Sequence, residues 1–200
     1  MDTAELLFAR RGFQGATTRE IVEAAGQRNA SALTYHFGTR ENLLVEILAR
    51  RGRTVDAARG ALLAELAVPS RGEPVASRDE PVASQDLVRC LVNPYAAELH
   101  TEGGRAYLRV VAQLRGHFAT WRVDSDEATT LNLATILDDL AARVPGPGEV
   151  RDSRLLAMMT LLTGVVAERA QAIDANRHLP LSHGDFCSEL VVMCTAVLGA

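Results

Sequence analysis

The chain has 200 residues, of which 48% are hydrophobic and 23% charged, and its formal net charge is −4 at pH 7. These values are typical of a globular protein with a buried core, and they argue against a protein that coats nucleic acid indiscriminately. No window approaches the ~18 consecutive apolar residues of a membrane span, and the N-terminus lacks the pattern of a secretory signal. We therefore expect a cytoplasmic protein with no membrane partner.

The charge is unevenly distributed along the chain. Residues 1–53 hold eight arginines against six acidic residues, whereas residues 54–200 hold thirteen against nineteen. A surface that faces nucleic acid, if one exists, is therefore expected at the N-terminus.

Two short helices are predicted first. One spans residues 3–11 and stops at Gly12, because glycine tolerates the left-handed conformation that ends many helices. Thr17 and Glu20 then have the spacing of a capping box, which opens a second helix that ends at Gly26.

This second helix should turn Ile21, Val22 and Ala25 inward. After a tight turn, a third short helix is predicted over residues 31–37. Thr39 is a good cap for a fourth helix, which runs to about residue 67. Its apolar stripe consists of Leu43, Leu44, Ile47 and Leu48.

Residues 71–84 form a tandem seven-residue repeat whose two copies differ at one position. Pro74 and Pro81 exclude a continuous helix, and the repeat has no coiled-coil spacing. We interpret this segment as a duplicated, flexible surface loop.

The remainder of the chain is predicted to be helical. The turn at residues 101–104 should end the first of these helices, and residues 145–148 form a strong break. The predicted helices span residues 85–100, 105–121, 124–144, 152–176 and 183–198. Because no stretch shows convincing two-residue alternation, we expect an all-α fold.

The cysteines indicate neither a metal centre nor a disulfide framework. Cys90, Cys187 and Cys194 form no C-x-x-C pair, so we expect free, buried thiols with no metal and no cofactor. A redox sensor is the alternative to this interpretation.

The second and third helices, joined by a tight turn, have the arrangement that enters a DNA major groove. A groove reader needs small residues near the bases, amides or hydroxyls for base edges, and donors for phosphates. The candidate DNA-binding residues are Thr17, Thr18, Arg19, Arg28, Asn29, Ala30, Ser31, Thr34, Tyr35, His36 and Arg40.

Residues 7–13, 17–26 and 33–44 together resemble the N-terminal domain of TetR/AcrR family transcriptional regulators. The resemblance covers about residues 3–50. It implies a three-helix DNA-binding domain at residues 1–48, with the helix-turn-helix at about 17–37. It also implies a helical effector-binding and dimerisation domain at residues 49–200.

The resemblance also implies roles for single residues. Tyr35 resembles the aromatic that packs on a base or sugar, and His36 and Arg40 resemble contacts to phosphates. Thr18 and Arg19 resemble phosphate contacts made at a helix N-terminus. This chain departs from the family at Thr34, where a tyrosine is usual, and in the turn at residues 27–29, which is one residue longer than the common pattern.

By the same resemblance, the expected partners are a near-palindromic double-stranded DNA operator, an unidentified small-molecule effector and a second copy of the chain. The last two predicted helices supply an apolar surface for a homodimer, although the core of a monomer could absorb them too. The predicted interface residues are Leu155, Met159, Leu162, Gly164, Val166, Phe186, Leu190, Met193 and Val197.

No ligand-binding residue is assigned. Arg109 and Gln113 lie opposite the apolar stripe of their predicted helix, so solvent exposure is expected for both. The sequence thus predicts a repressor that a ligand releases from its operator. An enzyme and an all-helical protein–protein module are the competing interpretations, but the sequence has no G-x-G-x-x-G, P-loop, H-E-x-x-H or G-x-S-x-G motif.

Overall fold

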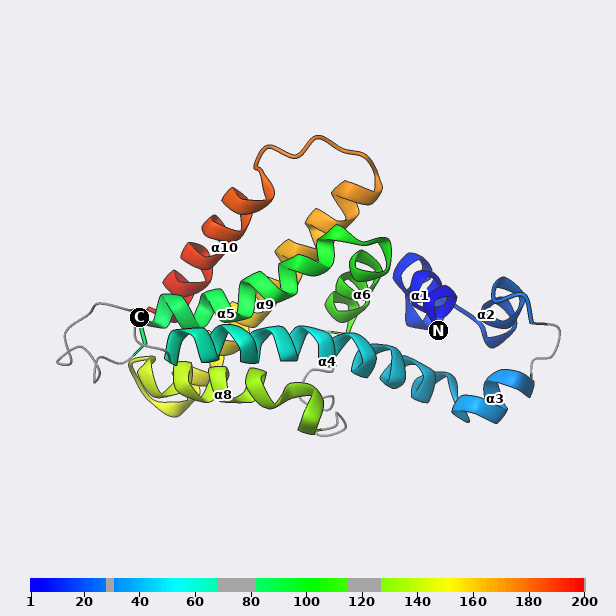
Figure 1. Ribbon diagram of the computed structural model, residues 1–200, viewed down its shortest axis with the longest axis horizontal. Helices are drawn as coiled ribbons and strands as arrows, with labels where there is room; N and C mark the ends of the chain where they lie inside the picture. The colour runs from blue at the N-terminus through cyan, green and yellow to red at the C-terminus, as the bar shows by residue number, and fades with distance from the viewer. Residues whose placement is uncertain (28–30, 68–81, 115–126, 200) are drawn as a thin grey trace. The chain divides into compact units, whose positions relative to one another are not determined.

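The computed structural model describes residues 1–27, 31–67, 82–114 and 127–199 (Figure 1). These described residues contain helices and no strand, so the predicted all-α class is confirmed. The chain forms two compact units, each assembled from separate segments. Unit 1 contains residues 1–53, 98–129 and 163–179, and unit 2 contains residues 54–97, 130–162 and 180–200. The predicted sequential boundary at residue 48 stays a prediction.

The helices follow the predicted order. Their bounds are α1 Asp2–Gly15, α2 Thr18–Ala24, α3 Ser31–Phe37, α4 Arg40–Ala67, α5 Ser84–Ala97, the 3-10 helix η2 Glu98–His100, α6 Glu102–Gln113, α8 Glu127–Arg143, α9 Gly148–Asp174 and α10 His183–Leu198. The predicted bounds of α3 and α10 are confirmed, as is the end of α4 at Ala67.

Helix α1 is interrupted rather than ended at Gly12. This residue has φ 75° and ψ 160°, and a short helical segment follows it to Gly15. The break was predicted correctly, but the prediction that the helix ends there was wrong. A backbone of this kind is essentially restricted to glycine, since a Cβ would strain it.

Three local predictions were wrong. A helix was predicted to end at a turn over residues 101–104, and the helical backbone of α5 and η2 does end at His100. Residues 102–104 are not a turn, however, but the start of α6, which Thr101 caps by accepting a hydrogen bond from the Gly104 amide at 2.9 Å. Helix α6 then ends at Gln113 rather than residue 121, and residues 115–126 lie outside the described ranges. Ala25 is exposed rather than inward, because α2 ends at Ala24.

The repeat at residues 71–84 falls mainly outside the described residues. Its last three residues are described, and Ser84 is the first residue of α5. Helix α5 therefore begins one residue earlier than predicted.

Each unit has its own hydrophobic core. The largest fully buried side chains of unit 1 are Phe8, Leu43, Ile47, Leu48 and Leu108. Those of unit 2 are Leu87, Leu91, Ile136, Leu140, Met158, Leu162 and Leu190. All four residues of the predicted α4 stripe are buried, which confirms the predicted inner face of this helix.

Within the described ranges, α9 alone is long and apolar enough to cross a membrane by length and composition. Its most apolar 18-residue window has a mean hydropathy of 1.2, and 39% of that window is buried. A partly buried core helix meets the same criteria, so this feature is weak evidence for a membrane span.

Replacing Gly12 by alanine is expected to lower the free energy of unfolding by about 1–3 kcal/mol, because the Gly12 backbone is strained for any L-residue. An added Cβ would meet only the Gln113 Oε1 atom, at 3.8 Å, so crowding contributes little. Chemical denaturation measures the effect. Gly15→Ala is the matched control, because Gly15 lies in the helical part of α1 and should tolerate alanine without loss of stability.

Candidate nucleic-acid interface

The start of α2 is fixed by the predicted capping box. The Thr17 hydroxyl accepts a hydrogen bond from the Glu20 amide at 3.3 Å, and the Glu20 carboxylate accepts one from the Thr17 amide at 2.9 Å. Hydrogen bonds from the amide and hydroxyl of Thr17 lower the pKa of Glu20. The capping-box prediction is thus confirmed, and it fixes the position at which α2 begins.

Arg19 lies on the exposed side of α2. Its side chain is 84% exposed, and its Nε donates to the Glu23 carboxylate one turn along the helix, at 2.7 Å. Thr18, at the first position of the helix, is half-buried. An exposed ion pair of this kind contributes little to stability, so the Arg19 guanidinium can exchange its partner for a phosphate at small cost.

Helix α3 divides into an inner and an outer side. Leu33 is 6% exposed and belongs to the core, whereas Tyr35 is 85% exposed. His36 is exposed as well, and its ring meets the Tyr35 ring edge-on, with centroids 5.1 Å apart. The fold of the chain does not need these two polar rings, which makes them available to a partner.

Part of the predicted site lies outside the described residues and side chains. Arg28, Asn29 and Ala30 are outside the described residues. Ser31 and Thr34 lie in the backbone of α3, and nothing is described of their side chains. The roles predicted for these five residues therefore stay predictions.

Arg40 has a structural role that the sequence did not reveal. Its Nη1 donates to the Ala16 carbonyl at 2.7 Å, and its guanidinium carbon lies 4.4 Å from the centre of the Phe13 ring. The Arg40 side chain is only 20% exposed. It therefore holds the connection between α1 and α2 against the start of α4.

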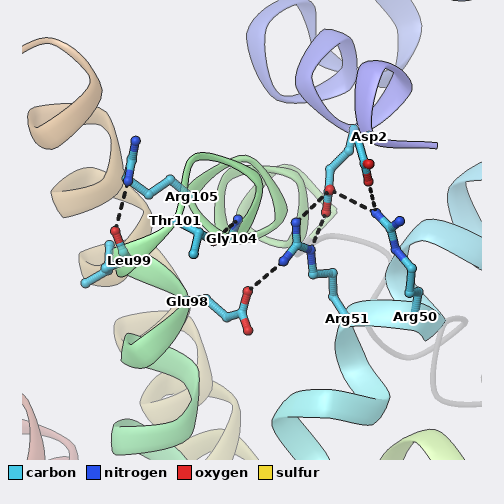
Figure 2. A network of polar contacts seen from close by, with 9 residues as sticks. Asp2, Arg50, Arg51, Glu98, Leu99, Thr101, Gly104 and Arg105 are labelled. Carbon is cyan, nitrogen blue, oxygen red and sulfur yellow. Dashed lines mark hydrogen bonds and ion pairs between the residues drawn. The ribbon is translucent and has the colours of Figure 1, made fainter. Parts of the chain in front are cut away.

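A buried carboxylate joins α1 to α4. The Glu5 side chain is fully buried, and its oxygens accept from Arg51 at 3.1 and 3.2 Å and from Arg50 at 3.3 Å. Arg50 also pairs with Asp2 at 2.6 Å, and Arg51 also pairs with Glu98 of η2 at 3.4 Å. Figure 2 shows Arg50 turned toward Asp2 and Arg51 turned toward Glu98.

The pKa values of the network follow from this geometry. A hydrogen bond from Arg50 lowers the pKa of Asp2, whereas burial raises the pKa of Glu98. Burial alone would lower the pKa of Arg51, but the hydrogen bond to Glu5 and the negative charges of Glu5, Glu98 and Asp2 together outweigh that effect and raise it. The sequence offered one signal for this network, since Glu5 shares a helical face with the buried Phe8 and Ala9.

The break at Gly12 allows a second connection, which joins α1 to α6. The Ala9 carbonyl lies one turn before the break and accepts from Arg109 at 2.8 Å and from Gln113 at 3.2 Å, both in α6. Arg109 also pairs with Asp174 at the end of α9, at 3.3 Å. The Arg109 side chain is 18% exposed, so the prediction of solvent exposure was wrong for this residue. Gln113 is exposed as predicted, although its amide is engaged.

Comparison with known proteins shows which family the N-terminal region resembles. Residues 1–47 match the family model of the bacterial regulatory proteins, tetR family. The predicted resemblance of the N-terminal region to this family is confirmed, over 47 of the 200 residues.

Two curated relatives also match the chain over a short region. The HTH-type transcriptional repressor AcnR of Corynebacterium glutamicum is 43% identical over 61 residues, which cover 30% of this chain and 29% of that protein. The HTH-type transcriptional repressor KstR2 of Rhodococcus jostii is 44% identical over 48 residues, which cover 24% and 23%. The chain thus matches less than a third of each relative, and both relatives are regulatory proteins rather than enzymes.

Two solved structures are similar over nearly the whole chain. The superantigen PfiT has a TM-score of 0.44 at 20% identity, with 96% of this chain and 91% of that chain covered. The TetR family regulator PfmR of Thermus thermophilus has a TM-score of 0.45 at 16% identity, with 98% and 92% covered. Neither similarity bears on function, because both TM-scores are low.

Replacing Glu5 by glutamine is expected to lower the free energy of unfolding by about 3 kcal/mol, because it leaves two arginines without their buried counter-charge. Urea denaturation measures the loss. Glu102→Gln is the matched control: Glu102 pairs with Arg10 on the surface, where both side chains are more than half exposed, so its removal should have little effect. Equal losses in the two variants would contradict the inference that the buried carboxylate organises this region.

Proposed function

We propose that the chain is a DNA-binding transcriptional regulator that represses its target and is released from its operator by a small ligand. The observation that carries the DNA-binding part is the exposed Tyr35–His36 pair on α3, in the region that matches the tetR family. Repression is supported by both curated relatives, which are named as repressors. Ligand release is supported by the resemblance to the family alone.

The proposed interface separates residues that hold the fold from residues that face DNA. In α3, the exposed Tyr35 and His36 supply rings and polar atoms for a base, sugar or phosphate. In α2, the exposed Arg19 and the helix N-terminus beside Thr18 supply positive potential for a phosphate. Arg40 stays in the proposal as a phosphate contact, but its main partners are Ala16 and Phe13.

Tyr35→Ala is expected to weaken binding to the chain's preferred DNA duplex about ten- to hundredfold, because it removes a contact worth roughly 1–3 kcal/mol. The duplex is obtained by selection from a random library, and fluorescence anisotropy measures binding. The melting temperature should not change, since Tyr35 is 85% exposed. Unchanged affinity for that duplex would contradict the proposed role of α3.

Arg19→Ala is expected to lower affinity for all duplex sequences and to reduce the salt dependence of binding by about one counterion. Titrations at several salt concentrations give this slope. Arg177→Ala is the matched control, because it removes an exposed arginine far along the chain from the proposed interface. The same change of slope in both variants would show that only net charge matters, and would remove Arg19 from the interface.

We further propose a homodimer formed through α9 and α10. Some of the predicted interface residues lie in the core of the chain itself: Leu162 and Leu190 are 1% and 0% exposed. Val166 and Phe186 are buried too, whereas Leu155, Met159, Gly164 and Val197 are half-buried. The side chains best placed to meet a second copy are therefore the exposed Met193 of α10, at 39%, and the exposed Leu156 of α9, at 61%.

Met193→Asp is expected to convert the dimer to a folded monomer, because a charge replaces an apolar side chain at the centre of the proposed interface. Sedimentation velocity measures the oligomeric state, and circular dichroism confirms helical content. Leu131→Asp on α8 is the control, since Leu131 is 64% exposed and lies outside the proposed interface. A monomeric parent chain, or a dimer that survives Met193→Asp, would contradict this arrangement.

As a regulator of this kind, the chain would act in the cytoplasm, where its operator lies, and would carry out no catalysis. Both statements rest on the family to which the N-terminal region belongs.

A further inference from the structure

A pocket of about 510 Å³ lies between α5 and α10, within unit 2. Figure 1 shows these two helices side by side. The polar wall of the pocket consists of Gln85, Arg89 and Asn93, which lie one turn apart along α5. The opposite wall contains His183 and Cys187 from the first turns of α10, followed by apolar residues of the same helix.

Cys187 has the surroundings of a nucleophile. Its Sγ lies 3.6 Å from the His183 Nε2, at hydrogen-bond distance for sulfur. The imidazole can take the thiol proton, and Arg89, which lines the same pocket, brings a positive charge of the sign that favours a thiolate. The other charged groups near this end of the pocket are Asp86, which pairs with Arg89, and Asp185, which bonds to Ser182.

The other two cysteines lack these features. All three thiols are buried, but Cys187 is 9% exposed, whereas Cys90 is 2% and Cys194 is 0% exposed. Burial raises the pKa of Cys90, and it raises the pKa of Cys194 to about 11. Both thiols therefore stay protonated near neutral pH, and they serve as internal references for Cys187.

We propose that this pocket is a covalent binding site for small α,β-unsaturated carbonyl compounds, with Cys187 as the nucleophile. The combination of groups favours this class. Amide and guanidinium donors on α5 suit a carbonyl oxygen that becomes an enolate, while Val191 and Val192 suit the carbon chain of the compound.

The reaction is an addition with no leaving group and no oxidant. His183 takes the thiol proton, and the Cys187 sulfur forms a bond to the β-carbon. The electron pair of the carbon–carbon double bond moves toward the carbonyl oxygen, where Arg89, Gln85 and Asn93 stabilise the enolate. The proton then passes from His183 to the α-carbon, which leaves a thioether and a saturated carbonyl compound.

The site does not depend on the proposed DNA binding, because all of its residues lie on α5 and α10. The test uses the full chain and N-ethylmaleimide, itself an α,β-unsaturated carbonyl compound, with peptide mapping by mass spectrometry over time. We expect native Cys187 to react at least about tenfold faster than Cys90 or Cys194, and faster than Cys187 in the urea-unfolded chain. A native rate at or below that of the unfolded chain would overturn the proposal.

Two variants test the positioning groups. His183→Gln is expected to slow the modification of Cys187 several-fold at pH 7 and to regain the parent rate near pH 9, where the thiol ionises without a base. A merely structural defect would not be corrected by pH. Arg89→Met should also slow the reaction. The modification rate of this variant should level off less as the probe concentration increases, because the pocket binds the probe more weakly.

The matched control is His178→Gln, because His178 is exposed and lies outside the pocket. The control should react like the parent chain. Parent-like rates in both His183→Gln and Arg89→Met would show that the pocket does not activate Cys187, and would overturn the proposal even if Cys187 were the fastest of the three thiols.

Discussion

The fully buried carboxylate of Glu5 is the constraint on which unit 1 depends. A charge without solvent needs opposite charge and hydrogen bonds around it, and two successive arginines of α4, Arg50 and Arg51, provide both. Because Arg51 also reaches Glu98, the same guanidinium connects α1, α4 and η2. A shift of α4 by one residue would separate these charges, so the network fixes the register of α4 against α1.

The backbone break at Gly12 has a comparable effect by another route. It frees the Ala9 carbonyl, which Arg109 binds, and the end of α1 leaves the Ala16 carbonyl free for Arg40. These arginines stabilise the N-terminal region from within. The residues proposed to meet DNA, Tyr35 and Arg19, make few contacts to the fold, which allows the surface to be specific without weakening its support.

Local chemistry made much of the fold predictable. Helix α10 was predicted with correct bounds because the Ser182 hydroxyl caps its start and Gly199 follows its end. Gly38 marks the end of α3 in the same way. The prediction of a turn at residues 101–104 failed because a threonine followed closely by two glycines fits a turn and a capped helix start equally well. The partners of Glu5 and Arg109 lie 45 or more residues away, so no local pattern could identify them. Local patterns therefore made the outline of the site predictable. The long-range contacts of Arg40 and Arg109 were not predictable from them.

Helix α10 carries the pocket and the proposed interface between copies on different faces. Leu190 and Cys194 face the core, Met193 faces solvent, and Cys187 lines the pocket toward α5. Because successive residues are rotated by about 100° on a helix of 3.6 residues per turn, the side chains of the pocket and of the proposed interface between copies occupy different faces. Association of two chains through Met193 therefore leaves the Cys187 pocket open to a small molecule, and the two proposals place no conflicting demand on the same helix.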